Sequence, residues 1–281
     1  MAGETTLNNV KTDELIDALQ GRGYFASKVP PPVEARTFKP DMGRFTGKAF
    51  RFGVLSCTHL GSKYSQMSAL HAFYRLAKKR GCEFMLHTGD NFDGSYNMHL
   101  GILHEQFAIG ADAQLEYAVK NYPKDVPTFM ISGNHCLSFY KDNGFNIVKA
   151  FADKRDDITY LGDMFAKIEL WGLKIVMAHG SGGVPYARSY RLQKMVEAMA
   201  SENKPNFLFV GHWHVPAYIP QLRNVEAWSM GCFQSQTPYL VGKQLYPVIG
   251  GLIVEVRPDG VGIGTVKYEW VPTYVPIEND Y

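Results

Sequence analysis

Five short apolar runs of this chain each end in a block of polar residues, and this pattern constrains the fold more than any other feature. The runs read as strands and cover 52–55, 84–86, 128–131, 174–178 and 207–210. The blocks that follow contain, in chain order, Cys57 and His59, Asp90 and Asp93, Asn134 and His135, His179, and His212 and His214. In open α/β sheets, ligands bind in a crevice at the carboxyl ends of the strands. We therefore expect these side chains to converge on one site.

Strand and helix patterns alternate after Gly47, which predicts an α/β fold. Apolar residues at helical spacing predict helices over 66–80, 102–121 and 186–200. Strands crowd together from residue 157 onward, at 158–161, 165–170 and 173–178, with a tight turn over 170–173, and again at 249–257 and 261–270. Two packed sheets flanked by helices is the layered arrangement that this pattern allows.

The first 46 residues differ from the rest of the chain. Residues 11–23 read as a short helix, and Pro30, Pro31 and Pro32 then predict an extended, semi-rigid connector. We predict a helical arm and proline-rich linker over 1–46 and one large domain over 47–281. The arm is expected either to dock a partner or to pack on its own domain or on a neighbouring subunit, as in a homo-oligomer.

Composition predicts an ordinary globular protein of the cytoplasm. Apolar residues make up 46% and charged residues 20% of the 281 residues. The sequence contains neither an apolar stretch of the ~18 residues that a membrane helix requires nor the features of a secretory signal. The four cysteines show no paired spacing, which favours a reducing compartment without disulfides. A net charge of +2 permits a nucleic-acid partner without arguing for one.

The ordered set of five blocks resembles the calcineurin-like metallophosphoesterase superfamily, over roughly residues 49 to 235. The resemblance implies an α/β/β/α sandwich, with two mixed β-sheets flanked by helices, and a metal-dependent phosphoester hydrolase with a dinuclear centre. It also implies the roles of the site residues. Asp90 would bridge two metal ions and His135 would donate a proton to the leaving group. The other ligands would be Cys57, His59 and His214 at the first metal, and Asn134, His179 and His212 at the second.

Two cysteines depart from the superfamily pattern. Cys57 stands where an aspartate is usual, and Cys136 stands where an acidic residue is usual. Imidazole and carboxylate ligands suit manganese, iron or zinc, and a thiolate at Cys57 would favour zinc or iron. The alternative is that Cys57 does not ligate, which would leave the first metal weakly bound and activity low. Cys136 is expected to weaken a contact that orients His135.

Residues around the site suggest what the substrate is. Lys63, Tyr64, Arg188 and Arg191 interleave basic and aromatic side chains, which is typical of surfaces that hold a phosphodiester backbone and stack bases. The two arginines could instead form the solvated face of a helix. His99 lies on the loop after Asp90 and could reach substrate, and Asp93 is expected to hold a ligand or organise its loop.

The block from Ser56 to Gly61 is similar to the opening motif of SbcD-type DNA repair nucleases, although the capping region of such nucleases is not evident after residue 235. Three hypotheses follow. The first is a phosphodiesterase, either a nuclease on DNA or RNA or an enzyme for a small diester. The second is a phosphomonoesterase for nucleotides or phosphoproteins. The third is a catalytically weakened binding module.

Overall fold

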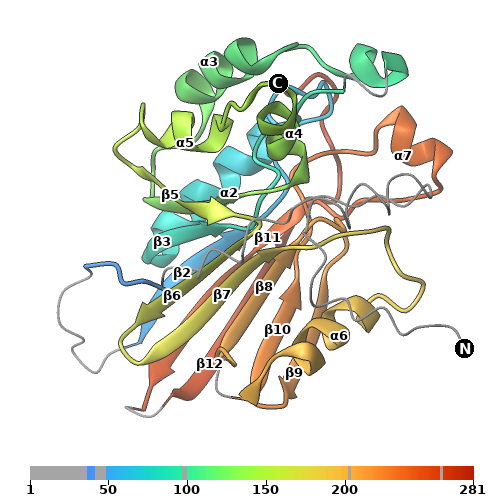
Figure 1. The fold of residues 1–281 in the computed structure, drawn as a ribbon. Helices are drawn as coiled ribbons and strands as arrows, with labels where there is room; N and C mark the ends of the chain where they lie inside the picture. Colours follow the sequence, from blue (N-terminus) through green and yellow to red (C-terminus); the bar gives the residue numbers. More distant parts are fainter. Residues whose placement is uncertain (1–36, 42–48, 97–99, 202–203, 260–261) are drawn as a thin grey trace, which may run out of the picture. The chain divides into compact units, whose positions relative to one another are not determined.

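Two six-stranded sheets form the centre of the chain in the computed structural model, which describes residues 37–41, 49–96, 100–201, 204–259 and 262–281 (Figure 1). The first sheet consists, in spatial order, of β12 (Ile263–Pro272), β11 (Gly250–Pro258), β2 (Phe50–Leu55), β3 (Cys82–His87), β4 (Thr128–Ser132) and β5 (Ile158–Asp163). The second consists of β1 (Thr37–Phe38), β6 (Phe165–Leu170), β7 (Leu173–His179), β8 (Phe207–Gly211), β10 (Val225–Ser229) and β9 (Ala217–Leu222).

Both sheets are mixed. In the first, strands β2, β3, β4 and β5 run parallel, whereas β11 runs antiparallel to both of its neighbours. In the second, β7, β8 and β10 are parallel, and β6 and β9 are the antiparallel partners of β7 and β10. The parallel groups matter for function because each delivers several strand ends to one edge of its sheet.

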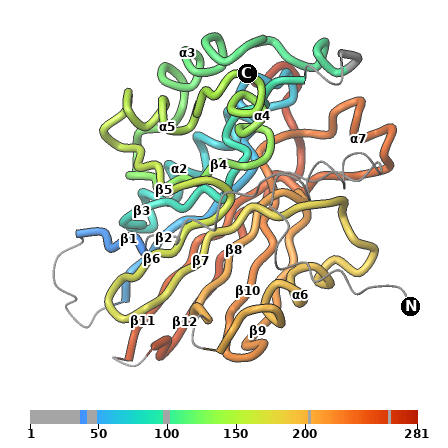
Figure 2. The backbone as a smooth tube through the Cα atoms, viewed as in Figure 1, coloured from blue at the N-terminus to red at the C-terminus, as the bar shows by residue number. Residues whose placement is uncertain are grey.

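Helices cover the outer faces of the two sheets (Figure 2). The first sheet carries α2 (Met67–Arg80), α3 (Ala111–Asn121), α4 (Asn134–Asn143) and α5 (Ile147–Ala152), and the second carries α6 (Tyr190–Ala198). Apolar side chains fill the space between the sheets, including Phe52, Phe84 and Phe209. Separate clusters lie under the helices. The predicted arrangement of two mixed sheets between helices is confirmed.

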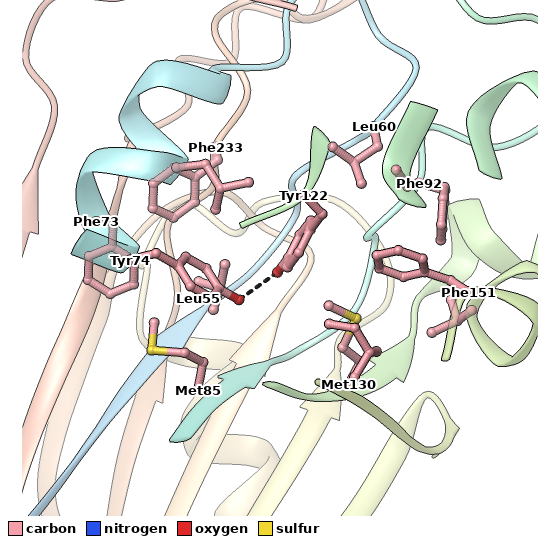
Figure 3. Close-up of a cluster of buried hydrophobic side chains, with 14 of the residues drawn as sticks. Leu55, Leu60, Phe73, Tyr74, Met85, Phe92, Tyr122, Met130, Phe151 and Phe233 are labelled. Carbon is pink, nitrogen blue, oxygen red and sulfur yellow. Dashed lines mark hydrogen bonds between the residues drawn. The ribbon is translucent and has the colours of Figure 1, made fainter. Parts of the chain in front are cut away.

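Helix α2 illustrates how the sequence dictates this packing. Its apolar residues recur at helical spacing and are buried against the first sheet: Met67, Leu70, Phe73, Tyr74 and Ala77. The helix ends at Gly81, whose φ of 75° is left-handed, and the Gly81 N–H donates to carbonyls of the last turn. Figure 3 shows Tyr74 inside this cluster, where its hydroxyl lies 2.8 Å from that of Tyr122.

The structure corrects three sequence-based expectations about elements. The segment predicted as one helix over 102–121 forms a 3-10 turn, η2 (Leu100–Glu105), and the separate helix α3. Gly110, whose φ of 91° is not helical, precedes α3 and prevents one continuous helix. The helix predicted over 186–200 begins only at Tyr190. Strands β9 and β10 were not predicted, and β9 contains Pro220, which an edge strand tolerates. The tight turn over 170–173 is confirmed between antiparallel β6 and β7.

The arm predicted over residues 1–46 lies largely outside the described residues. Strand β1 is its one described element, and it pairs in parallel with β6. The division of the chain at residue 46 therefore stays a prediction. Within the described part of the chain, no helix combines the length and apolarity needed to cross a lipid bilayer.

Candidate metal centre

The predicted ligands come from strand ends of both sheets. Strands β2, β3 and β4 of the first sheet lead to Cys57, Asp90 and Asn134, while β7 and β8 of the second lead to His179 and His212. The structure brings potential ligand atoms within 4.8 Å of one another in three sets: Cys57, His59 and His214; Cys57, Asp90 and His179; and His59, Asp90 and His135. Cys57, His59 and Asp90 belong to two sets each, so they occupy the middle of the cluster.

Several of these residues hold unusual backbone conformations. Positive φ angles occur at Cys57 (52°), His59 (46°), Asp90 (51°), His212 (94°) and His214 (56°). Residues other than glycine rarely adopt this region, at a cost on the order of 1–3 kcal/mol each, and such conformations cluster at functional sites. Cys57 shares this backbone conformation with Asp90 and three of the histidines, and its sulfur lies among the potential ligand atoms of the cluster.

Asp90 and His179 form the tightest contact of the cluster. His179 Nδ1 donates to the carbonyl of Thr88 at 2.8 Å, while His179 Nε2 lies 2.9 Å from Asp90 Oδ2 and 3.1 Å from Asn134 Oδ1. Burial opposes charge on both groups, but their mutual attraction lowers the pKa of Asp90 well below its usual value and raises the pKa of His179.

This arrangement of His179 fits a bound cation. With Nδ1 protonated, neutral His179 presents a nitrogen lone pair at Nε2, which would face two oxygen acceptors. A proton on Nε2 or a metal ion among the three atoms resolves that conflict. Nitrogen, carboxylate and amide oxygen form a donor set that suits zinc, iron or manganese.

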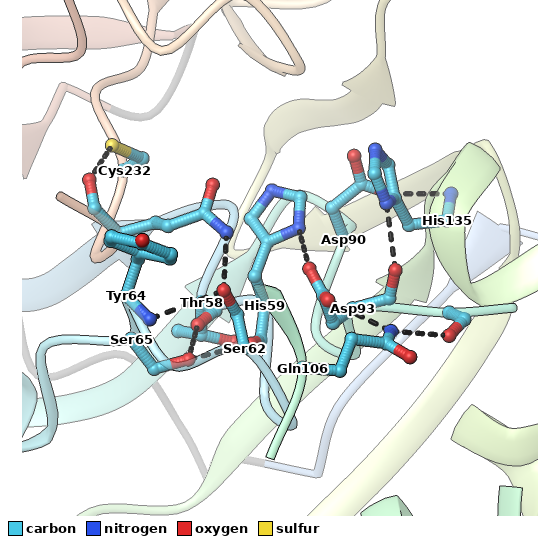
Figure 4. Close-up of polar contacts among 12 residues, drawn as sticks. Thr58, His59, Ser62, Tyr64, Ser65, Asp90, Asp93, Gln106, His135 and Cys232 are labelled. Atoms are coloured by element: carbon cyan, nitrogen blue, oxygen red, sulfur yellow. Dashed lines mark hydrogen bonds and ion pairs between the residues drawn. The ribbon is translucent and has the colours of Figure 1, made fainter. Parts of the chain in front are cut away.

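His59 and His214 form a second facing pair. Their Nε2 atoms lie 3.2 Å apart, and burial lowers the pKa of both rings, so each imidazole is neutral and able to offer a lone pair. His59 Nδ1 lies 3.3 Å from Asp93 Oδ1, and Gln106 donates to Asp93 Oδ2 at 2.8 Å (Figure 4). Asp93 therefore orients His59, as a partner on the second nitrogen of a ligating histidine commonly does.

The thiol of Cys57 is fully buried between the two sheets. Its Sγ lies 3.0 Å from Ser56 Oγ and 3.3 Å from the backbone nitrogen of His212. Burial, with the charge of Asp90 nearby, raises the pKa of Cys57 well above that of a free thiol. A metal ion would be needed to deprotonate it, because a coordinated thiol loses its proton outright.

A backbone carbonyl outside the ligand cluster orients the ring of His212. Its Nε2 donates to the carbonyl of Gly182 at 3.0 Å, which leaves Nδ1 as the nitrogen with a lone pair. Burial lowers the pKa of His212 to about 4. The guanidinium of Arg191 lies so close to Gly182 that a Cβ at this glycine would collide with it. Arg191 thus supports the segment that orients His212.

His135 is positioned differently from the other histidines. Its Nδ1 lies 2.8 Å from the carbonyl oxygen of Asp93 and 3.2 Å from the hydroxyl of Tyr96, and its backbone N–H donates to Asp90 Oδ1 at 2.9 Å (Figure 4). Because a carbonyl only accepts, Nδ1 carries a proton, and His135 Nε2 is available to a substrate. Sequence reasoning missed Tyr96, which no motif marks.

The thiol of Cys136 donates to Asn91 Oδ1 at 3.6 Å, and burial raises the pKa of this thiol to about 12. That Cys136 weakens a contact that orients His135 stays a prediction. All four cysteines are free thiols.

Two glycines permit the close approach of the ligand loops. A Cβ at Gly89, where φ is 96°, would meet the ring of His179, and one at Gly133 would meet the carboxylate of Asp90. Alanine at either position would push a predicted ligand aside.

Two neighbouring lobes open over the cluster and share Asn134, His135, His214, Tyr239 and Leu240. The first, called the apolar lobe, is about 320 Å³ in volume and is also walled by Val184, Trp213, Val215, Leu245, Tyr246 and Pro247. The second lobe, about 330 Å³, is also walled by Ser95, Tyr96, Ile102, Glu105, Gln234 and Thr237, among others. Helix α7 (Pro238–Gly242) supplies Tyr239 and Leu240, which no sequence motif singled out.

The four predicted substrate-binding residues that the structure describes, Lys63, Tyr64, Arg188 and Arg191, do not line these lobes. Lys63 and Tyr64 line a separate cavity of about 470 Å³, which has Tyr246 and Pro247 in common with the apolar lobe. Arg188 is exposed before α6, and Arg191 packs on Gly182. His99 lies outside the described residues.

Comparison with known proteins places the chain in a family. The model of the calcineurin-like phosphoesterases matches residues 50–216, more than half of the chain. The chain therefore belongs to the calcineurin-like phosphoesterase family, whose members are metal-dependent hydrolases of phosphoesters. No curated protein matches the chain.

The chain is also similar, at low sequence identity, to several solved structures. A predicted phosphoesterase of Streptococcus pneumoniae is 14% identical, with 80% of this chain and 99% of that one covered and a TM-score of 0.38. Vps29 of Entamoeba histolytica, as a single mutant, is 16% identical at the same coverage and TM-score. A protein of Thermotoga maritima is 15% identical, again at 80% and 99% coverage, with a TM-score of 0.37.

Proposed function

We propose that this protein is a phosphodiesterase with a dinuclear metal centre. The position of Asp90 is the observation that supports the proposal. Its carboxylate lies within 4.8 Å of potential ligand atoms of His59, predicted at the first metal, and of His179, predicted at the second. A bridging carboxylate offsets the repulsion between two dications held a few ångströms apart. The first metal would be held by Cys57, His59 and His214, and the second by Asn134, His179 and His212.

Such a metal pair supplies an activated water and neutralises charge on the phosphate. The protein's own residues would orient the reaction. The Asp93 carboxylate contacts the ring of His59, and the Asp93 carbonyl accepts a hydrogen bond from the ring of His135. The Gly182 carbonyl accepts a hydrogen bond from the ring of His212. His135 lines both lobes, and it can protonate a leaving group from Nε2 when that nitrogen carries a proton in addition to the one on Nδ1.

The walls of the lobes favour a diester over a monoester. Among the described residues that line them, none is lysine or arginine, and Glu105 adds a carboxylate. A monoester dianion and a long nucleic-acid backbone both need cationic partners beyond the metals. A small diester carries one negative charge and two substituents, which matches two lobes on either side of the ligands.

The test combines metal analysis with hydrolysis of two chromogenic esters. The protein loaded with zinc, iron or manganese should hold two metal ions per chain and cleave bis-p-nitrophenyl phosphate faster than p-nitrophenyl phosphate. Asp90→Asn should lose metal and turnover, whereas Asp112→Asn on the surface of α3 should lose neither. An Asp90→Asn protein with both metals and full activity would end the dinuclear proposal, and cleavage of the monoester alone would support a phosphomonoesterase.

A further inference from the structure

We infer that the apolar lobe binds an uncharged apolar or aromatic substituent of the substrate, an inference that rests on the proposed phosphodiesterase function. The lobe reaches from the predicted ligands Asp90, His212 and His214 to a wall without charged side chains among the described residues. A phosphate held at those ligands would direct one of its substituents along that wall.

Aromatic side chains at the lobe are left partly open to solvent. Tyr239 is 47% exposed and Tyr246 is 69% exposed, whereas Trp213, which also lines the lobe, is buried with only 4% of its surface accessible. Exposed aromatic groups at the rim of a cavity are typical of sites that bind apolar or planar ligands, because most of the ligand's surface becomes buried there.

Helix α7 is anchored in a way that keeps this wall in place. Thr237 accepts a hydrogen bond from the backbone of Leu240 at 3.2 Å, and Glu105 Oε1 accepts one from the backbone nitrogen of Tyr239 at 2.9 Å. Both contacts fix Tyr239 and Leu240, which line both lobes. The lobe is therefore a formed pocket, and its shape should select among substituents.

The size and chemistry of the lobe indicate the substituent class. Its volume of about 320 Å³ lies at the small end of ligand pockets, so it suits one ring system and not an oligonucleotide. The absence of described lysine or arginine residues from its wall disfavours a second phosphate there. The inferred substrate class is a small phosphodiester with one uncharged ring, such as a phenyl group or a nucleobase-sized heterocycle.

The experiment keeps the leaving group constant and changes the other substituent. Phenyl p-nitrophenyl phosphate should exceed methyl p-nitrophenyl phosphate in kcat/KM by about ten-fold or more, since apolar groups in a fitting pocket discriminate on that scale. Leu245→Ala should lower kcat/KM for the phenyl ester more than for the methyl ester. Val241→Ala, on α7 and 57% exposed but outside both lobes, should leave both values unchanged.

Binding provides a readout that is independent of turnover. Calorimetry on the zinc-loaded protein should give tighter binding of diphenyl phosphate than of dimethyl phosphate, with the difference reduced in Leu245→Ala. Equal binding of the two anions, or a preference that Leu245→Ala does not change, would overturn the inference. If neither ester is cleaved but diphenyl phosphate is preferred, the proposed activity fails while the lobe keeps its assigned ligand.

Discussion

The backbone N–H of His212 donates to the thiol of Cys57, with 3.3 Å between nitrogen and Sγ. This contact joins the second residue after β2 in the first sheet to the first residue after β8 in the second. Cys57 therefore occupies the junction of the two sheets as well as the middle of the ligand cluster. An aspartate at this position could accept the same hydrogen bond and would offer an oxygen ligand instead of sulfur.

Exchange of that sulfur should change the metal preference. With Cys57 as a ligand, zinc or iron should support the highest activity, because thiolates bind these ions better than manganese. Cys57→Asp should raise activity and metal content in manganese, and Cys57→Ala should weaken metal binding at the first position only. Cys82→Ala, at the far end of β3, controls for loss of a buried thiol. Identical manganese content and activity in Cys57→Asp and the parent would mean that Cys57 takes no part in the site.

Loss of the imidazole at position 135 should affect rate and not metal content. A positioned acid contributes about 10²–10⁴-fold to such steps, so kcat of His135→Ala should fall on that scale, most of all for esters with poor leaving groups. Elemental analysis should still find the parent's metals, and His71→Ala on α2 should behave as the parent. Metal loss in His135→Ala would instead identify His135 as a ligand.

Asp280, near the end of the sequence, should stabilise the N-terminal turn of α2 through contacts with Ser68. Its carboxylate accepts hydrogen bonds from the backbone N–H and the hydroxyl of Ser68, at 2.8 and 2.5 Å, in a first helical turn that has no acidic residue of its own. Removing a side chain that caps a helix costs about 0.5–2 kcal/mol. Denaturant unfolding of Asp280→Ala should show a loss of this size, whereas Glu278→Ala should stay within ~0.5 kcal/mol of the parent.

A buried chain of hydroxyls makes a further stability prediction. Tyr122 and Thr128 each lie 2.8 Å from the Tyr74 hydroxyl, and Thr128 donates to the carbonyl of Val126. Tyr74→Phe interrupts the middle of this chain and leaves buried groups unpaired, which costs about 1–3 kcal/mol. Tyr122→Phe removes only the end of the chain and should cost less. Unfolding free energies in the reverse order would refute the arrangement.

The same tyrosines should make the protein sensitive to base. Burial raises the pKa of Tyr74 and Tyr122 above the value near 10 of an unfolded tyrosine. The folded state therefore holds these protons more tightly, so their contribution is complete below about pH 10 and is lost as the pH rises toward the folded values. The free energy of unfolding should therefore fall as the pH rises above about 10, and it should fall less in Tyr122→Phe.

The order of strands and ligand blocks was readable from the sequence because it depends on local periodicity. Apolar runs before Cys57, Asp90, Asn134, His179 and His212 became strands β2, β3, β4, β7 and β8, and their ends met as predicted. Strand β9 was missed, because an edge strand with a proline and one exposed face lacks the apolar run that marks a central strand.

Contacts between side chains of different loops were decided only by the tertiary structure. The order of strands in the first sheet pairs Asp93 with His59 and turns Cys136 toward Asn91, and the path of the chain after β7 sets Arg191 against Gly182. The tertiary structure also leaves Lys63 and Tyr64 in a neighbouring cavity and brings α7 over the ligands. Residue types and their spacing determined which side chains could bind metal, whereas the shape and charge of the pocket around them depend on tertiary contacts that no local pattern encodes.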